Sequence, residues 1–255
     1  MTKTNSRIIP SLLLKGGGFY KTVRFKRPVY LGEPVNILKI FNEKEVNEIA
    51  ILDIDATVKK RGPNFTLLQD LASECFMPLA YGGGLTSMEQ IKRLFRIGFE
   101  KAIINTGAIE TPGLIEEAVR MFGAQSVVVC IDVKKKLLGG DEVVIRGGRQ
   151  KTGMKPENWA RRVEALGVGE IIINSVDRDG TMSGYDLDLI GRVTRAVGVP
   201  VVASGGARNI SDFAAAVKSA HASACAAGAM FVFQGRHRAV LINVPPAKEI
   251  ERALD

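Results

Sequence analysis

Two stretches of the sequence contain residues whose types and spacing could bind phosphate. Residues 78–108 read PLAYGGGLTSMEQIKRLFRIGFEKAIINTGA, and residues 200–229 read PVVASGGARNISDFAAAVKSAHASACAAGA. An alignment of the two superposes four pairs of residues: Gly83 on Gly205, Gly84 on Gly206, Asn105 on Ala227, and Thr106 on Gly228. Glycine turns of this kind leave backbone N–H groups pointing outward beside a helix start, where they can hold a phosphate group. The repeat therefore predicts two phosphate sites and a phosphorylated small-molecule ligand.

Aspartates stand at the ends of three predicted strands, which is where barrel enzymes carry their chemistry. These residues are Asp53, Asp55, Asp132, Asp177 and Asp179. A carboxylate in this place can act as a general acid or base, or position a substrate. It can equally accept hydrogen bonds as an ordinary strand-end group, and that alternative stays open for each of them. His221 and His237 are the only histidines and neither stands with carboxylates, so we expect no metal site and no cofactor.

Apolar strands and amphipathic helices must position these residues. We expect strands at residues 7–15, 48–55, 101–106, 126–132 and 170–175, with three more inside the repeated stretches. Near-continuous apolar strands are typical of a parallel sheet covered by helices. Eight strand–helix units predict an α/β fold, a (β/α)8 TIM barrel built from two duplicated half-barrels, in a single domain over residues 1–255. A doubly wound open sheet is the structural alternative.

Local signals place the helices and the loops. Pro34, Pro112 and Pro156 should open helices, and Gly123 and Gly167 should end two of them. We also expect a helix at residues 64–75, a capping box from Thr86 to Glu89, and Val46 and Val197 on the apolar faces of their helices. Residues 15–33 have no helical period and predict a mobile lid, whereas residues 134–155 predict a basic loop folded as a hairpin.

Composition narrows the class of protein. The 255 residues carry a formal charge of +8 and are 46% hydrophobic. The basic residues are scattered through loops and aromatic residues are few, so we expect no nucleic-acid partner, and an anionic small substrate or a solvated surface accounts for the charge. No apolar run reaches the roughly 18 residues of a spanning helix and no signal peptide is evident, so we expect a cytoplasmic protein with no membrane partner. Cys75, Cys130 and Cys225 lack metal-ligand spacing and should be reduced core residues.

Seven motifs in this order resemble the cyclase subunit of imidazole glycerol phosphate synthase, the HisF family. They are RIIP, LDIDAT, YGGG, INTGA, FGAQSVVVCID, GVGEIIINSVDRDGTMSGYD and ASGGA, within about residues 7–233. The resemblance implies a barrel of two half-barrels with a HisH-like glutaminase docked on the amino-terminal face of the strands. It also implies that ammonia travels through the barrel to the carboxyl-terminal face.

The resemblance also assigns roles to residues. It places two phosphate grips on two groups: Gly83, Gly84, Asn105 and Thr106, and Ser204, Gly205, Gly206, Ala227 and Gly228. It implies that Lys21 is the family's lid-loop lysine, that Asn174 stands where threonine is usual near the substrate, and that Asp179 is a further substrate-binding candidate. It places an ammonia gate on four charged residues at strand starts: Arg7, Glu48, Lys101 and Glu170. Two cations and two anions could neutralise one another in a ring, and ordinary strand-end solubility is the alternative.

One position departs from the family's catalytic pattern. The family uses an aspartate at the end of the first strand and another at the end of the fifth, and here these positions hold Leu13 and Asp132. The internal repeat also lays Leu13 over Asp132. Because leucine can neither donate nor accept a proton, a pair of carboxylates has become one, a loss that typically removes about 10²–10⁴ of rate. With its ending FVFQGRHRAVLIN, the chain resembles the HisF-like, glycosyl amidation-associated WbuZ type.

Three functions follow from these features. The first is a barrel subunit that, with a HisH-like glutaminase and a separate sugar amidotransferase, conducts ammonia for acetamidino group formation on a bacterial surface-polysaccharide sugar. The second is the imidazole glycerol phosphate synthase cyclase of histidine biosynthesis, working with Asp132 alone. The third is a non-catalytic assembly protein, against which the intact phosphate grips argue.

Overall fold

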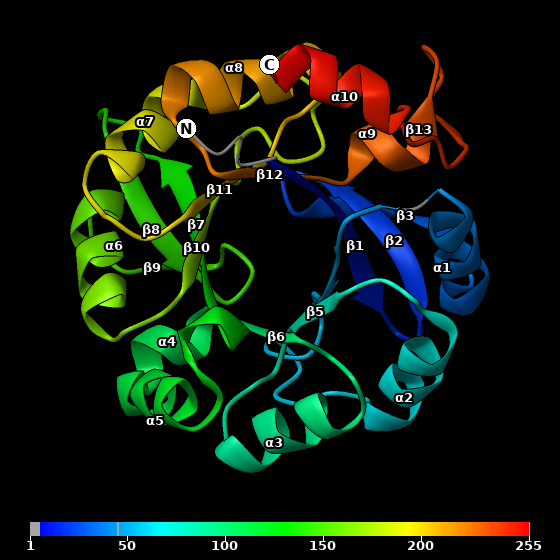
Figure 1. Cartoon of the computed structure of the whole chain (residues 1–255). Helices are drawn as coiled ribbons and strands as arrows, with labels where there is room; N and C mark the ends of the chain where they lie inside the picture. The colour runs from blue at the N-terminus through cyan, green and yellow to red at the C-terminus, as the bar shows by residue number, and fades with distance from the viewer. Residues whose placement is uncertain (1–5, 45, 255) are drawn as a thin grey trace.

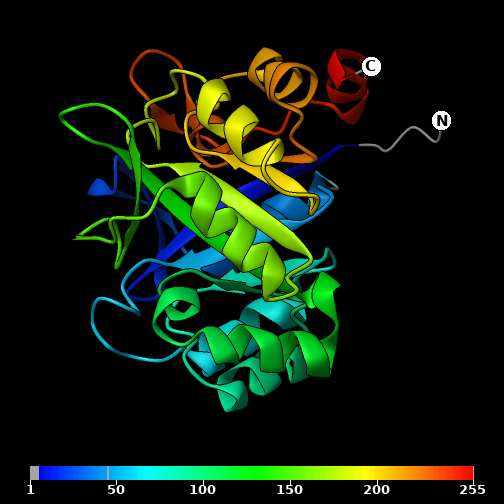
Figure 2. The same ribbon diagram turned by 90° about the vertical axis from the view of Figure 1, so that its left-hand side faces the viewer.

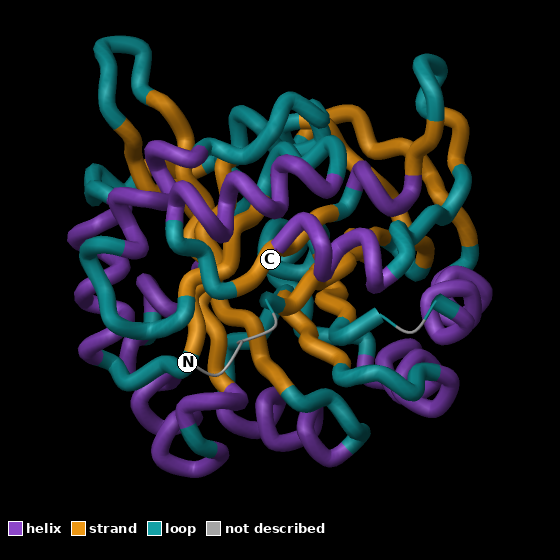
Figure 3. Tube along the Cα trace, turned by 45° about the horizontal axis from the view of Figure 1, so that its top comes forward, coloured by secondary structure: helices purple, strands orange, loops and turns teal. Residues whose placement is uncertain are grey.

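Eight parallel strands form a closed ring inside a layer of helices (Figure 1 and Figure 3). The computed structural model describes residues 6–44 and 46–254. Both ends of the domain predicted over residues 1–255 lie outside the described residues. The same is true of most of the N-terminal stretch that bears on the signal-peptide prediction. Pairing of β7 with β10 closes the ring. The barrel strands in chain order are β1 (Arg7–Lys15), β4 (Ile49–Asp53), β5 (Leu79–Gly82), β6 (Lys101–Ile104), β7 (Val127–Lys135), β10 (Glu170–Ser175), β11 (Val201–Ser204) and β12 (Ala224–Ala227). The predicted TIM barrel is confirmed.

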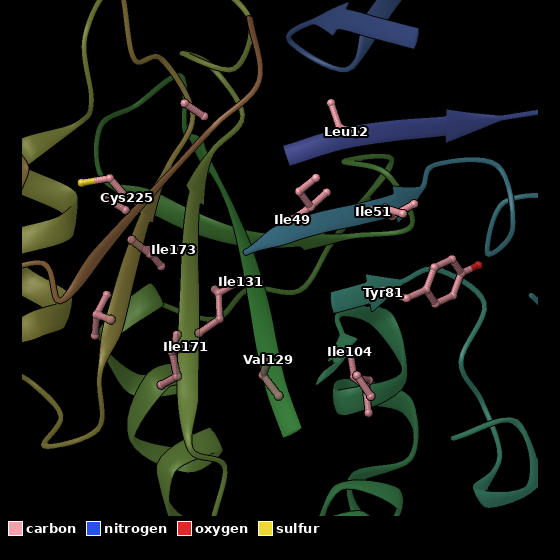
Figure 4. Packing of buried hydrophobic residues seen from close by; sticks show 14 of the residues in the cluster. Leu12, Ile49, Ile51, Tyr81, Ile104, Val129, Ile131, Ile171, Ile173 and Cys225 are labelled. Atoms are coloured by element: carbon pink, nitrogen blue, oxygen red, sulfur yellow. The ribbon is translucent and has the colours of Figure 1, made fainter. Parts of the chain in front are cut away.

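Strands bury both faces because helices cover the outside and the barrel wall encloses the inside. Alternate residues of each strand pack outward against the helices, as Leu12, Ile51, Val129 and Ile171 do in Figure 4. The predicted limits of β1 and β10 agree with the structure. The stretch predicted as a strand at residues 101–106 ends at Ile104, because Thr106 already opens a helix.

Helices follow the barrel strands and their apolar stripes face the strands. The full helices are α1 (Pro34–Glu43), α2 (Phe65–Glu74), α3 (Met88–Arg96), α5 (Pro112–Phe122), α6 (Pro156–Ala165), α7 (Leu187–Thr194), α8 (Ile210–Ala220) and α10 (Ala247–Leu254). Shorter turns form α4 (Thr106–Glu110), α9 (Ala229–Val232) and the 3₁₀ turn η1 (Ala124–Ser126). The three prolines predicted to open helices each occupy the first turn. Among the described residues, no helix has the length and hydrophobicity needed to cross a bilayer.

Some helix details differ from the predictions. The capping box of α3 joins Ser87 to Gln90 rather than Thr86 to Glu89. Both Thr86–Glu89 and Ser87–Gln90 fit the capping-box pattern. The pair Ser87–Gln90 makes Met88 the first helical residue, which is compatible with the burial of Met88. Val46 and Val197 lie beyond the ends of α1 and α7, so they are not on those helices, although both still pack against the core.

Two hairpins extend the carboxyl-terminal end of the barrel. Residues 18–32 form an antiparallel hairpin, β2 (Gly18–Val23) and β3 (Lys26–Gly32), and β2 pairs with β1. The absence of helix predicted for this segment is confirmed, and its role as a mobile lid stays a prediction. β3 could not be recognised from the sequence, because this strand is exposed over most of its length and its buried and exposed residues do not alternate. The second predicted hairpin is confirmed as β8 (Asp141–Ile145) and β9 (Gln150–Lys151), pairing with β7. Both hairpins lie on the left-hand side of Figure 2, opposite the end of the barrel at which β1 begins. A third, short hairpin joins β13 (Phe233–Gln234) to β14 (Ala239–Val240).

Strand pairing shows how the two half-barrels correspond. Leu13 pairs with Leu52 on β4 as Asp132 pairs with Asn174 on β10, so Leu13 occupies the position of Asp132 in its own half. The repeat alignment needs one correction at the next strands. Asn105 precedes α4 as Gly228 precedes α9, which makes Gly228, and not Ala227, the equivalent of Asn105.

The inner wall of the barrel is lined by small side chains over much of its circumference. The interior cluster contains four alanines, Ala50, Ala80, Ala224 and Ala226, beside larger residues such as Ile9 and Val128. Barrels of this type are usually filled by layers of bulky branched side chains. The alanines leave space along the axis.

Candidate active site

A cavity of about 330 Å³ occupies the barrel and its carboxyl-terminal mouth. Glu48 and Glu170 line its amino-terminal end, Ala50, Ala80 and Ala226 line its middle, and Asp132 lies in the wall at the mouth. All of the substrate-binding candidates named from the sequence line this one cavity: Lys21, Gly83, Gly84, Asn105, Thr106, Asn174, Asp179, Ser204, Gly205, Gly206, Ala227 and Gly228. The structure therefore brings them together, although their roles stay a prediction.

Four charged side chains close the amino-terminal end of the cavity as a ring. The Arg7 guanidinium donates to both Glu48 and Glu170. Lys101 Nζ lies 2.8 Å from Glu48 Oε2 and 3.2 Å from Glu170 Oε2. The two carboxylates are buried, and each contacts both cations. The predicted neutralising ring is present, and the alternative of solvated strand-end charges does not fit this burial.

Asp132 lies in β7, lines the cavity near the mouth, and is held by two amides. Asn174 Nδ2 donates to Oδ1 at 2.8 Å, and Asn105 Nδ2 donates to Oδ2 at 3.1 Å. Burial raises the pKa of Asp132 to about 7, the Asn174 hydrogen bond opposes this rise, and the charge of Asp179 adds to it. Near neutral pH the carboxyl is thus present in both its acid and its base forms, which is the condition for general acid–base catalysis.

The other strand-end aspartates are engaged by neighbours. Asp53 Oδ1 accepts from the backbone N–H groups of Asp55 and Ala56 at 3.0 and 3.1 Å. Asp177 accepts from the Lys135 N–H at 2.8 Å. The loop-capping interpretation therefore holds for Asp53 and Asp177. Asp55 and Asp179 form ion pairs, with Lys59 and Lys21 respectively.

Leu13 lies in the wall of the same cavity and is 7% exposed. Its side chain offers no donor or acceptor to a substrate. Within the described residues, Asp132 forms no ion pair with a cation, whereas Asp53, Asp55 and Asp179 each form one. At the two positions related by the fold's symmetry, the mouth therefore has one carboxyl, which is held by neutral amides, and one leucine.

The glycine pairs adopt backbone conformations that other residues rarely reach. Gly83 has φ +126°, and a Cβ there would lie 2.5 Å from the Asp53 carbonyl oxygen. In the other half Gly206 has φ +116°, and its Cβ would lie 2.3 Å from the Gly184 carbonyl oxygen. Both turns need glycine for conformation and for space. They pass over the neighbouring loop at the edge of the cavity.

Cationic side chains accompany both turns. Lys21 is 5% exposed, its Nζ lies 2.8 Å from Asp179 Oδ1, and its stem packs over Gly228. Sequence reasoning missed Arg149, which also lines the cavity from the β8–β9 turn. The Arg146 N–H in the same hairpin donates to Thr106 Oγ1 at 3.0 Å and ties the hairpin to the start of α4.

Comparison with known proteins agrees with this geometry. Residues 7–237 match the family described as "Histidine biosynthesis protein". The chain belongs to this family. The resemblance to HisF read from the motifs is confirmed at this level, over nearly the whole barrel.

Curated relatives of the histidine biosynthesis family align along almost the whole chain. A Pseudomonas aeruginosa protein named "Putative imidazole glycerol phosphate synthase subunit hisF2" is 46% identical over 245 residues, covering 96% of this chain and 98% of that protein. A Leptospira interrogans protein named "Putative imidazole glycerol phosphate synthase subunit HisF" is 43% identical, covering 96% and 97%. "Imidazole glycerol phosphate synthase subunit HisF" of Alkaliphilus metalliredigens is 39% identical, covering 98% and 96%.

Proposed function

We propose that this chain is the ammonia-using barrel subunit of a HisF-type glutamine amidotransferase of the imidazole glycerol phosphate synthase kind. A HisH-like glutaminase docks over the charged ring, ammonia enters between the four side chains, and a phosphorylated substrate is held at the mouth beside Asp132. The observation that carries the proposal is the single cavity that has Glu48 and Glu170 at one end and Asp132 at the other.

The reaction that the relatives' names favour is the ammonia-dependent cyclisation and cleavage of a phosphoribulosyl aminoimidazole precursor. In this proposal the glycine turns at Gly83 and Gly206 hold the two phosphate groups, and Lys21 supplies a cation to one of them. Asp132 transfers the protons, since its pKa of about 7 makes both forms available. With Leu13 opposite, this single carboxyl has to serve as acid and base in turn.

Leu13 favours a second candidate, the sugar-amidation subunit of the WbuZ type. A conduit for ammonia needs the charged ring and the hollow barrel but no pair of cyclising carboxylates. In this case ammonia leaves the mouth for a separate sugar amidotransferase. The ring, with both carboxylates bound to both cations, is common to the two candidates.

A genetic and an isotopic experiment test the proposal and separate the candidates. The gene should restore growth without histidine to a strain that lacks its cyclase, and an Asp132→Asn copy should not. The purified complex with a HisH-like glutaminase should also transfer ¹⁵N from amide-labelled glutamine to imidazole glycerol phosphate. Failure of both, with ¹⁵N instead reaching an acetamidino sugar when the amidotransferase is added, would overturn the cyclase in favour of the conduit.

A further inference from the structure

The β2–β3 hairpin is fastened to the loop after β10 by several contacts. The Arg24 N–H donates to the Asp179 carbonyl at 2.9 Å, and Arg24 Nε donates to the Asp177 carbonyl at 3.0 Å. Gly180 lies so close that a Cβ there would be 2.0 Å from the Thr22 carbonyl oxygen. This packing holds Lys21, on β2, over the mouth.

Lys21 stands between an anion-binding turn and a carboxylate. Its Nζ lies 2.8 Å from Asp179 Oδ1, and its Cε would lie 3.3 Å from a Cβ placed on Gly228. Both members of the ion pair are largely withdrawn from water, with side-chain exposures of 5% and 14%. An ammonium that is this buried is a strong electrostatic partner for any anion that enters the cavity, because water screens it poorly.

Asp179 is also the neighbouring charge that acts on Asp132. Its negative charge raises the pKa of the Asp132 carboxyl. The groups that hydrogen-bond to Asp132 are neutral at pH 7: Asn105 from the residue after β6, Asn174 from β10 and Cys130 from its own strand. Leu13 of β1, which lines the same cavity, carries no charge either. Lys21, Asp179 and Asp132 line the same cavity, so the state of the Lys21–Asp179 pair contributes to the electrostatic field at Asp132.

We propose that Lys21 is a transferable counter-ion: a phosphate group at the Gly228 turn draws the ammonium away from Asp179, and the unbalanced carboxylate then holds a proton on Asp132. Asp179 is in this scheme a positioning residue that acts through Asp132, and the proton comes from solvent as the ligand binds. The inference rests on the proposed phosphate site. The counter-ion transfer would protonate Asp132 once the substrate is bound. In the free protein near pH 7, the same carboxyl is about half ionised.

Carbon NMR of ¹³C-labelled aspartate, with the Asp132 signal assigned from its loss in Asp132→Asn, follows the titration directly. In the wild-type protein, saturating inorganic phosphate should move the Asp132 midpoint upward, on the order of one pH unit, as nearby charges do. Without phosphate, Asp179→Asn should lower the midpoint and Lys21→Met should raise it. In both variants the further movement caused by phosphate should be less than half of the wild-type movement. Asp177→Asn, which removes a carboxylate from the same loop, is the matched control and should respond like the wild type.

Thermal unfolding with phosphate separates failure of this inference from failure of the site. If phosphate stabilises all four proteins but moves the Asp132 midpoint equally in each, the counter-ion transfer is overturned while the phosphate site stands. If phosphate stabilises none of them, including the wild type, the phosphate site and the inference fall together.

Discussion

Replacing Asp132 with asparagine should make the fold more stable relative to the wild type as the pH rises from 5 to 8. Burial raises the pKa of Asp132 to about 7, whereas aspartate in an unfolded chain titrates near 3.9. The protonated carboxyl therefore contributes stability that is fully present below about pH 4 and is lost as the pH rises through about 7. At roughly 1.36 kcal/mol for each pH unit, the wild-type protein should lose about 2–3 kcal/mol between pH 5 and pH 8 relative to a variant with no ionisable group there.

Urea unfolding of the wild type and Asp132→Asn at several pH values from 5 to 8 measures this difference. The side chain of asparagine has one oxygen, so it cannot replace both Asp132 oxygens that accept from Asn105 and Asn174. The lost hydrogen bond lowers the free energy of unfolding of the variant by the same amount at every pH. Ile131→Val is the matched control, because this neighbour on β7 faces the helices and carries no charge. Its cost should stay near ~1 kcal/mol at every pH. A difference between Asp132→Asn and the wild type that is the same at pH 5 and pH 8 would refute the assignment of a raised pKa to Asp132.

Three other variants test the ring, the turns and the cavity. Lys101→Met should lower the free energy of unfolding in urea by about 3 kcal/mol, because it leaves Glu48 and Glu170 with one cation. Adding Glu48→Gln should recover part of the loss, and a Lys101→Met variant as stable as the wild type would argue against a buried ring. Gly206→Ala should lower the free energy of unfolding by about 2 kcal/mol or more and abolish thermal protection by phosphate. Gly235→Ala should keep that protection, because Gly235 also has a positive φ but has nothing within 4 Å of an added Cβ. Ala80→Leu should fill the middle of the cavity and reduce glutamine-driven turnover of the glutaminase complex at least tenfold. Turnover with added ammonium salt should stay nearly unchanged. Equal losses with both nitrogen sources would contradict passage of ammonia through the barrel.

The barrel could be predicted from the sequence because its strands are buried on both faces. Runs such as Glu170–Ser175 are buried at every position and apolar at their centre, and the glycine pairs recur at the same place in both halves. The β2–β3 hairpin could not be predicted, because β3 is exposed over most of its length and pairs with β2, which in turn pairs with β1. The capping box was misplaced by one residue because two consecutive positions fit the motif.

The candidate site was predicted in its residues but not in its electrostatics. Motif order placed Asp132, Lys21 and the ring residues near one cavity. The sequence does not say that Lys21 is buried against Asp179 or that Asn105 and Asn174 both bind Asp132, since these contacts join residues far apart in the chain. Arg149 was missed because an exposed arginine in a basic loop looks like any solvated charge until the hairpin is folded over the mouth.

The measurement that tests the central claim most directly is turnover of the phosphoribulosyl aminoimidazole precursor with ammonium salt, without a glutaminase. The wild type should turn over slowly, Asp132→Asn should be inactive, and Leu13→Asp, which restores a carboxylate at the symmetric position, should gain about 10²–10⁴ in rate. Turnover that is unchanged in Asp132→Asn would contradict the proposal that this single carboxyl transfers the protons.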